Sequence, residues 1–330
     1  MKKTWNIASI ELENPVVLAP MAGYTDSPYR RICRRFGAGL VYSDLISSLG
    51  ICFNNEKTMH MLEFDPEERP VNLQLFGAIP EKMAIASKVV EKKGFEMLDI
   101  NMGCPAPKIT KNGCGGALLK DPMKIKDILQ AVVESVAIPV TVKIRIGYSR
   151  DHINCEEVAQ IAQEAGVKAI AVHGSTVEQG SKGKKNWDAI KAVKQCVDIP
   201  VIANGGVKSI KDFFAIQQYT NADAVMIGRA VIGRPWFFKL VDRALDGEEP
   251  ELLDREKVNP DVLFQTIYDH FDLQLEYYGD ELLAVREMRK HLHGYFHGQP
   301  ESCRIRDQVN KVKNKKEMLT LLRNYQNTFF

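Results

Sequence analysis

The feature that most constrains the fold is a regular alternation of short β-branched segments and amphipathic segments over the first two-thirds of the chain. Eight apolar segments have the composition of strands: residues 16–19, 40–43, 71–75, 97–101, 140–145, 169–173, 201–204 and 224–227. Segments with helical spacing separate most of them, such as residues 80–93, 122–136, 156–165 and 209–219. Strands that alternate with helices form parallel βαβ units. Eight such strands favour an α/β fold of the (β/α)8 TIM-barrel type over an open doubly wound sheet.

Polar and glycine-rich motifs follow the predicted strands directly. They are Met21-Ala-Gly, Gln74-Leu-Phe-Gly, Asn101-Met-Gly-Cys-Pro, Lys143-Ile-Arg, His173-Gly, Asn204-Gly-Gly and Gly228-Arg. In a TIM barrel the carboxyl ends of all strands meet at one rim, where active sites are built. The sequence therefore predicts a functional site at this rim.

The pattern changes after the last predicted strand. We assign residues 1–242 to the barrel and residues 243–260, which are rich in Asp, Glu, Pro and Gly, to a linker. Residues 261–330 are expected to form a small C-terminal all-helical domain with its main break near residues 294–301. Its predicted core consists of Leu263, Ile267, Phe271, Leu275, Leu282, Val309, Met318 and Leu322.

Charge is distributed unevenly along the chain. Overall, 44 Lys+Arg and 42 Asp+Glu give a formal charge of +2, which excludes a histone-like or acidic-tail protein. Residues 286–330 carry ten Lys/Arg and four Asp/Glu, a local charge of +6, which leaves −4 for residues 1–285. The basic segment is either a solvated helix face or a surface that contacts a phosphate backbone.

Cysteine usage and hydropathy bound the class of protein. The seven cysteines include no CxxC pair, which indicates reduced thiols and neither a disulfide framework nor a metal site. No apolar run approaches the roughly 20 residues of a membrane span, and the first residues lack the apolar stretch of a signal peptide. We therefore expect a cytoplasmic protein without a membrane partner.

Two glycine turns indicate a phosphate site. Asn204, Gly205 and Gly206 follow the seventh predicted strand, and Gly228 and Arg229 follow the eighth. Glycines allow backbone N–H groups to approach an anion, helix N-termini favour it, and arginine adds a charged fork. Each turn alone is weak evidence, but their shared position, where many barrels bind phosphate, predicts a phosphorylated cofactor.

Three further strand ends carry hydrogen-bond donors suited to a flavin ring. Gln74, Lys143 and His173 offer amide, ammonium and imidazole groups on the same rim. An ammonium beside the flavin N1 would stabilise the anionic reduced ring. Individually, each residue has an ordinary structural explanation, but their combination on one rim with the phosphate turns favours a flavin.

Cys104 lies in a loop between Gly103 and Pro105. A free thiol, with an ordinary pKa near 8.5, is able to donate a proton or, as a thiolate, to attack an electrophile. Burial as a small apolar residue is the usual alternative, and Cys114 is the rival candidate. Lys108, Lys111, Lys120 and Arg145 flank the predicted mouth and suit a polyanionic substrate or simply solvent.

At this point the sequence resembles the tRNA-dihydrouridine synthases, most nearly the bacterial type B branch, over almost its whole length. The resemblance is carried by the motifs that begin at Leu18, Asn72, Asp99, Val142, Val172, Ile202, Met226 and Arg286. Met102-Gly-Cys-Pro and Arg289-Lys-His are the most specific elements, because other flavin barrels share the remaining motifs.

The resemblance implies an enzyme that reduces the C5–C6 double bond of uridines in tRNA, with flavin mononucleotide (FMN) as cofactor and NADPH to recharge it. Reduced flavin would deliver hydride to C6, and Cys104 would protonate C5. Cofactor-binding residues would be Pro20, Met21, Gln74, Lys143, His173, Asn204, Gly205, Gly206, Gly228 and Arg229. RNA-binding residues would be Arg286, Arg289, Lys290 and His291, with Arg145 as a further candidate at the mouth. We expect a monomer with tRNA, not DNA, as its partner.

One stretch departs from the family pattern. Two arginines and a tyrosine that commonly follow the histidine motif are replaced by Ser175, Val177 and Ser181. Nearby lysines at 182, 184 and 185 restore charge without the fork or stacking plane of arginine. Two alternatives therefore stay open: a small-molecule flavin oxidoreductase of the dihydroorotate-dehydrogenase or old-yellow-enzyme type, and a non-catalytic RNA-binding module on a flavin barrel.

Overall fold

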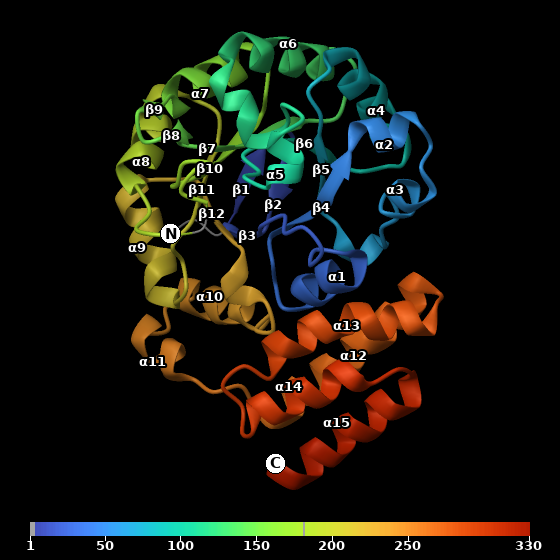
Figure 1. Ribbon diagram of the computed structural model, residues 1–330. Coiled ribbons are helices and arrows are strands. Elements are labelled where there is room, and N and C mark those ends of the chain that lie inside the picture. The colour runs from blue at the N-terminus through green and yellow to red at the C-terminus, as the bar shows by residue number, and fades with distance from the viewer. Residues whose placement is uncertain (1–3, 181) are drawn as a thin grey trace.

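The computed structural model describes residues 4–180 and 182–330 and shows a barrel followed by a helical domain (Figure 1). The first three residues, on which the signal-peptide expectation partly rests, and Ser181 lie outside the described residues. Within the described ranges, no helix is long and apolar enough to cross a membrane.

Eight parallel strands close into the predicted TIM barrel. In chain order around the barrel they are β3 (Val16–Leu18), β4 (Leu40–Ser47), β5 (Val71–Phe76), β6 (Met97–Met102), β7 (Val140–Arg145), β10 (Ala169–His173), β11 (Val201–Asn204) and β12 (Ala224–Ile227). Their residues are almost all buried, because helices cover the outside of the sheet and side chains fill its inside. The expected fold class is confirmed.

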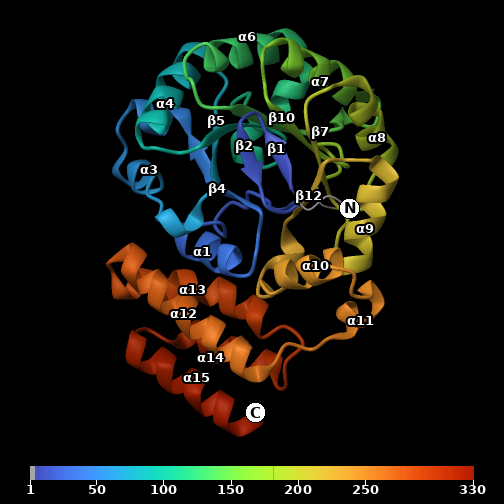
Figure 2. The ribbon, with the colours of Figure 1, turned by 180° about the vertical axis from the view of Figure 1, so that it is seen from behind.

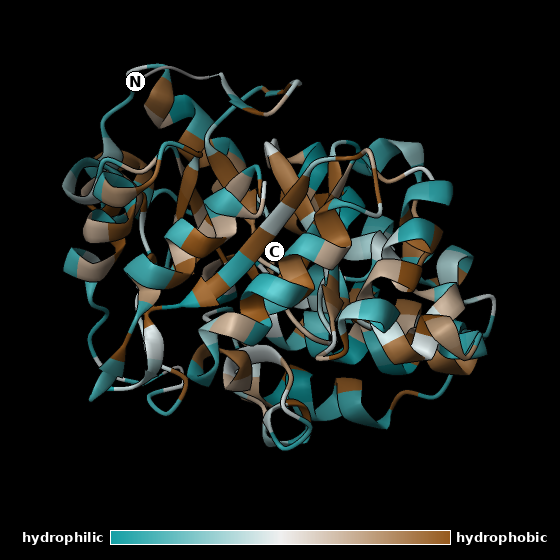
Figure 3. Ribbon diagram, turned by 90° about the horizontal axis from the view of Figure 1, so that it is seen from above, coloured by the Kyte–Doolittle hydropathy of each residue, from teal (hydrophilic) through white to brown (hydrophobic). Residues whose placement is uncertain are grey.

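Helices surround the barrel and carry one buried and one exposed face, visible as alternating brown and teal in Figure 3. They are α1 (Ser27–Arg35), α2 (Ser48–Cys52), α3 (Glu56–His60), α4 (Pro80–Lys92), α5 (Pro107–Thr110), α6 (Pro122–Val133), α7 (Cys155–Glu164), α8 (Trp187–Cys196), α9 (Ile210–Thr220), α10 (Phe237–Leu245) and α11 (Pro250–Arg255). Short 3-10 turns are η1 (Pro66–Glu68), η2 (Gly115–Lys120) and η3 (Arg229–Val231).

Two small antiparallel hairpins were not expected. Strands β1 (Trp5–Ile7) and β2 (Ile10–Leu12) pair with each other and lie across one end of the barrel (Figure 2). Ile7 and Leu12 are fully buried and pack with inward-facing barrel residues, so this hairpin closes the interior at that end. The second hairpin is formed by β8 (Gly147–Ser149) and β9 (His152–Ile153).

The C-terminal domain is all-helical, as predicted. It consists of α12 (Pro260–Tyr278), α13 (Glu281–Tyr295), α14 (Ser302–Lys311) and α15 (Lys315–Phe329). Seven of the eight predicted core residues are buried or pack against the domain core, but Leu282 was wrongly placed there, since it is 43% exposed on the first turn of α13. The segment predicted as a linker contains α11, whose Leu253 is buried in the barrel core.

The domain packs closely against the barrel. Helix α12 contacts α1, and Gly233, after β12, meets Gly294 of α13 backbone to backbone. A Cβ at Gly233 would lie 2.0 Å from the Gly294 carbonyl carbon, so no larger residue fits there without displacing the helix. The position of α13 relative to the barrel rim is therefore fixed by direct contact.

Candidate active site

A large cavity of about 1210 Å³ opens at the carboxyl ends of the barrel strands. The ten predicted cofactor residues all line it: Pro20, Met21, Gln74, Lys143, His173, Asn204, Gly205, Gly206, Gly228 and Arg229. Cys104 and Arg145 line the same cavity. The structure thus brings together side chains from seven strand ends, as expected from the barrel topology.

The side-chain amide of Gln74 is held in one orientation by buried neighbours. Its Nε2 donates to Asp99 Oδ2 at 2.6 Å, and its Oε1 accepts from Asn101 Nδ2 at 2.8 Å. Asp99 Oδ1 accepts in turn from the Thr141 hydroxyl at 2.6 Å. Burial raises the pKa of Asp99 to about 6, although these hydrogen bonds oppose the rise. Asp99 and Asn101 therefore orient Gln74, a positioning role that the sequence did not indicate.

Lys143 lies in the wall of the cavity. Its Nζ donates to Asn204 Oδ1 at 3.2 Å, and Asn204 Nδ2 donates to the Met226 carbonyl at 2.7 Å, so the amide of Asn204 is oriented from both ends. Burial, followed by the charge of Arg145, lowers the pKa of Lys143 to about 8. The ammonium is therefore mostly charged at pH 7 and mostly deprotonated above about pH 8.

His173 pairs in register with Asn204 on one neighbouring strand and with Arg145 on the other. Burial and then the charge of Lys143 lower its pKa well below the ordinary value, so its ring is neutral. Its Nδ1 is buried without a hydrogen-bond partner. An unpaired buried polar atom at a cavity wall is costly unless a ligand completes it.

The two glycine turns form one corner of the cavity. Gly205 and Gly206 have φ values of +112° and +94°, which only glycine adopts without strain. Arg229 is exposed beside Gly228 at the start of η3. The eighth strand is followed by the short 3-10 turn η3 and not directly by an α-helix. A ligand anion there would therefore be held by backbone N–H groups and the Arg229 guanidinium.

The loop that carries Cys104 is fixed from two sides. Asn101 Oδ1 accepts from the Cys104 backbone N–H at 2.9 Å, and the Cys104 carbonyl accepts from the Gly116 N–H at 3.0 Å. Its thiol is partly exposed and close enough to Lys143 and Arg145 to raise the pKa of both when ionised. Cys114, the rival candidate, is buried, its thiol directed at the Asn112 carbonyl, and it does not line the cavity.

Arg145 is a structural element of the rim. Its guanidinium is buried and donates to the carbonyl oxygens of Gly103, Thr176 and Gly180 at 2.7, 3.0 and 2.7 Å. These three hydrogen bonds tie the Cys104 loop to the loop after β10, and the RNA contact expected of Arg145 stays a prediction.

The loop that departs from the family pattern packs inward. Ser175 and Val177 are both buried, and the Val177 methyl groups fill the space that a Cβ on Gly116 would occupy. Neither side chain reaches the rim surface. Lys184 and Lys185, which the sequence indicated as restoring charge, line the cavity, as does Lys208, which it did not indicate.

The predicted RNA-binding residues of α13 differ in exposure. Arg286 is exposed, whereas Lys290 is paired with Glu287, and Arg289 donates to the Val312 carbonyl. His291 is fully buried at the contact with the barrel. The expectation that His291 contacts RNA is therefore corrected, because helix packing turns this position inward.

Comparison with known proteins agrees with these motifs. The model of the family described as "Dihydrouridine synthase (Dus)" matches residues 17–330. Two proteins named tRNA-dihydrouridine synthase B are similar to the chain: that of Pasteurella multocida is 39% identical, covering 97% of this chain and 95% of its own, and that of Vibrio cholerae is 37% identical, covering 97% and 98%. A third, from Pseudomonas aeruginosa, is 39% identical over 93% of this chain and 91% of its own. The chain belongs to the dihydrouridine synthase family.

Proposed function

We propose that this protein is a cytoplasmic, monomeric tRNA-dihydrouridine synthase, which reduces the C5–C6 double bond of uridines in tRNA and uses FMN recharged by NADPH. The observation that carries the proposal is the position of Cys104 on the wall of a large cavity that also contains Lys143, Arg145 and the two glycine turns. Membership of the dihydrouridine synthase family supports the same reaction.

The residues of the cavity fit FMN. The unpaired Nδ1 of His173 is a buried polar atom that a ligand would complete. Gly205 leaves room beside His173, since a Cβ there would lie 3.3 Å from His173 Nε2. The glycine turns and Arg229 would hold the phosphate, and Gln74 and Lys143 would hold the ring. When bound there and reduced, FMN would supply the hydride for C6 of the uracil.

The thiol of Cys104 would then complete the reduction. Addition of hydride at C6 places negative charge on C5 and O4, and the Cys104 S–H bond breaks as its proton passes to C5. Lys143 and Arg145, which line the same cavity, are charged at neutral pH.

A uracil inside folded tRNA is inaccessible, so the base must be extruded into the cavity. The lysines at the mouth and the exposed Arg286 are suited to hold the phosphate backbone. A requirement for RNA distinguishes this function from a small-molecule flavin oxidoreductase, for which the basic helical domain would be superfluous.

The test is a reaction of the purified protein with unmodified tRNA, FMN and NADPH, followed by nucleoside analysis. We expect yellow protein and dihydrouridine at defined tRNA positions. Reduction of free enones or orotate with no product in tRNA would instead support the small-molecule alternative. FMN-loaded protein that binds tRNA but forms no dihydrouridine, under conditions where a known synthase does, would contradict the enzyme assignment.

A further inference from the structure

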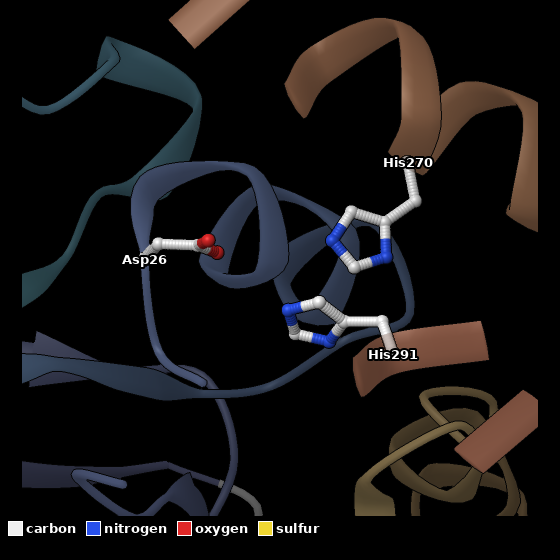
Figure 4. A group of neighbouring side chains, drawn as sticks. All are labelled: Asp26, His270 and His291. Atoms are coloured by element: carbon white, nitrogen blue, oxygen red, sulfur yellow. The ribbon is translucent and has the colours of Figure 1, made fainter. Parts of the chain in front are cut away.

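Asp26, His270 and His291 meet at the contact between the barrel and the helical domain. Asp26 is the N-cap of α1 in the barrel, and the histidines belong to α12 and α13. Figure 4 shows the Asp26 carboxylate facing the two rings, each of which directs a ring nitrogen toward the carboxylate. The cluster is separate from the cavity described above, since none of these residues lines it.

The spacing of these atoms suits a shared cation. One ligand atom from each of the three side chains lies within 4.8 Å of the other two. Both histidines are 0% exposed, and Asp26 is partly buried. Imidazole nitrogens with one carboxylate oxygen form a donor set typical of zinc, in which ligands surround the ion tetrahedrally.

His291 has unmet hydrogen-bonding capacity. Both of its ring nitrogens are buried without a partner, and so is Oε1 of Gln274 in the same cluster. Buried polar side chains are normally hydrogen-bonded, to protein or to water, so each of these atoms requires an explanation. A bound ion would satisfy the ring nitrogen of His291 that faces Asp26.

His270 has the outer support that metal-binding histidines show. Its Nδ1 lies 3.1 Å from the Tyr295 hydroxyl, so Nε2 carries the lone pair when Nδ1 carries the proton, and that lone pair faces the side chain of Gln274. The Tyr29 ring packs on both imidazoles, with centroids 5.6 Å from His270 and 4.9 Å from His291.

Gln274 lies where a fourth ligand would be needed. Its Nε2 lies 3.0 Å from Asp26 Oδ2 and 3.3 Å from His270 Nε2, between two of the candidate ligands. A half turn of the amide would exchange Nε2 for the unpartnered Oε1 and present an oxygen to the same point. Asp26 Oδ2 also accepts from the Tyr278 hydroxyl at 3.2 Å, and Oδ1 caps α1 by accepting from the Tyr29 N–H at 3.1 Å.

We propose that Asp26, His270 and His291, completed by the Gln274 side-chain oxygen, bind one divalent transition-metal ion of the zinc class. The ion links the barrel to the helical domain, because the ligands come from both. From the sequence we expected no bound metal. The site could not be recognised there, because Asp26 and His270 are far apart along the chain. The competing explanation is a metal-free hydrogen-bond network centred on the Gln274 amide.

The test uses the full-length protein with any purification tag removed. After treatment with EDTA and gel filtration, the protein is titrated with cobalt(II) and with zinc(II). Bound metal is measured by mass spectrometry, and cobalt coordination by its visible absorption. We expect about one ion per chain, a cobalt spectrum typical of nitrogen and oxygen ligands, and a higher Tm with zinc.

His270→Gln and His291→Gln should each lose the bound ion and the zinc-dependent rise in Tm. His293→Gln is the matched control on the same helix, where His293 contacts Asn310, and it should bind as the unaltered protein does. Asp26→Asn tests the third proposed ligand: it removes the carboxylate, keeps the size of the side chain and leaves both buried histidine rings unaltered. Less than a tenth of an equivalent of cobalt or zinc in the unaltered protein, or equal binding by all variants, would overturn the proposal in favour of the metal-free network.

Discussion

The Arg145 Nε donates a 2.7 Å hydrogen bond to the carbonyl oxygen of Gly103, the residue before Cys104. The same guanidinium reaches Thr176 and Gly180 in the loop after β10. One buried side chain therefore fixes the loop that carries the proposed proton donor, after β6, against the loop after β10, on the other side of β7. Burial lowers the pKa of Arg145 to about 10, which still leaves it charged at neutral pH.

Replacement of Arg145 should impair catalysis through the position of Cys104. Arg145→Met leaves three backbone carbonyls without their donor, at a cost of about 1–3 kcal/mol of folding stability. Displacement of the loop should lower kcat about 10- to 100-fold. Stopped-flow oxidation of reduced flavin by tRNA, together with denaturant unfolding, measures both effects. Arg150→Met, at an exposed position, is the control, and equal rates in the two variants would refute the positioning role.

Cys104 and Cys114 should differ sharply as alanine variants. Cys104→Ala should retain FMN but form dihydrouridine about 10²–10⁴-fold more slowly, because the positioned acid is lost. Cys114→Ala should remain near the unaltered rate, since Cys114 is buried away from the cavity. Dihydrouridine formation in a single turnover measures both rates. The reverse order of rates would assign the proton donor to Cys114.

The pKa of Lys143 predicts two opposite pH effects. Its charge is present below its pKa of about 8 and lost above it, so FMN affinity should fall as the pH rises from 7 to 9.5. In the unfolded chain the pKa returns to about 10.4, so between about 8 and 10 the unfolded state binds more protons. The ligand-free protein should therefore become more stable over that range.

Fluorescence titration of FMN and denaturant unfolding at each pH separate these two effects of Lys143. Lys143→Met should weaken FMN binding at pH 7 and should flatten both profiles, because no group titrates at that position. Profiles that keep their shape in Lys143→Met would show that another group is responsible.

Arg286 should contribute to tRNA binding through a phosphate contact. Arg286→Ala should weaken binding of different tRNAs about equally and reduce the slope of log affinity against log salt by about 1. Fluorescence anisotropy at several salt concentrations measures this slope. Lys88→Ala is the control, since Lys88 is an exposed cation on α4, which covers the barrel. An unchanged slope in Arg286→Ala would remove this residue from the RNA surface.

The barrel and most of its rim were predictable because both depend on local sequence. Strand periodicity and the motifs that end each strand specify which side chains meet, as they did for Gln74 and His173. The inward position of His291 was not predictable, because it depends on how α13 packs against α1. The function of Arg145 was hidden for the same reason: its partners are backbone atoms of loops distant in sequence. The same holds for residues 243–260, which were expected to form a linker: they contain α11, and its Leu253 is buried in the barrel core.

Gly205 should be indispensable for cofactor binding for two reasons that a control can separate. An alanine at φ +112° is strained, which costs about 1–3 kcal/mol of stability, and its Cβ would lie 3.3 Å from His173 Nε2. Gly37 has a similar φ of +90° but nothing within 4 Å of a Cβ, so Gly37→Ala carries strain without the contact. Both variants should lose stability in denaturant unfolding, while only Gly205→Ala should lose FMN in equilibrium dialysis. Equal FMN retention in the two variants would show that Gly205 is needed for the turn and not for the ligand.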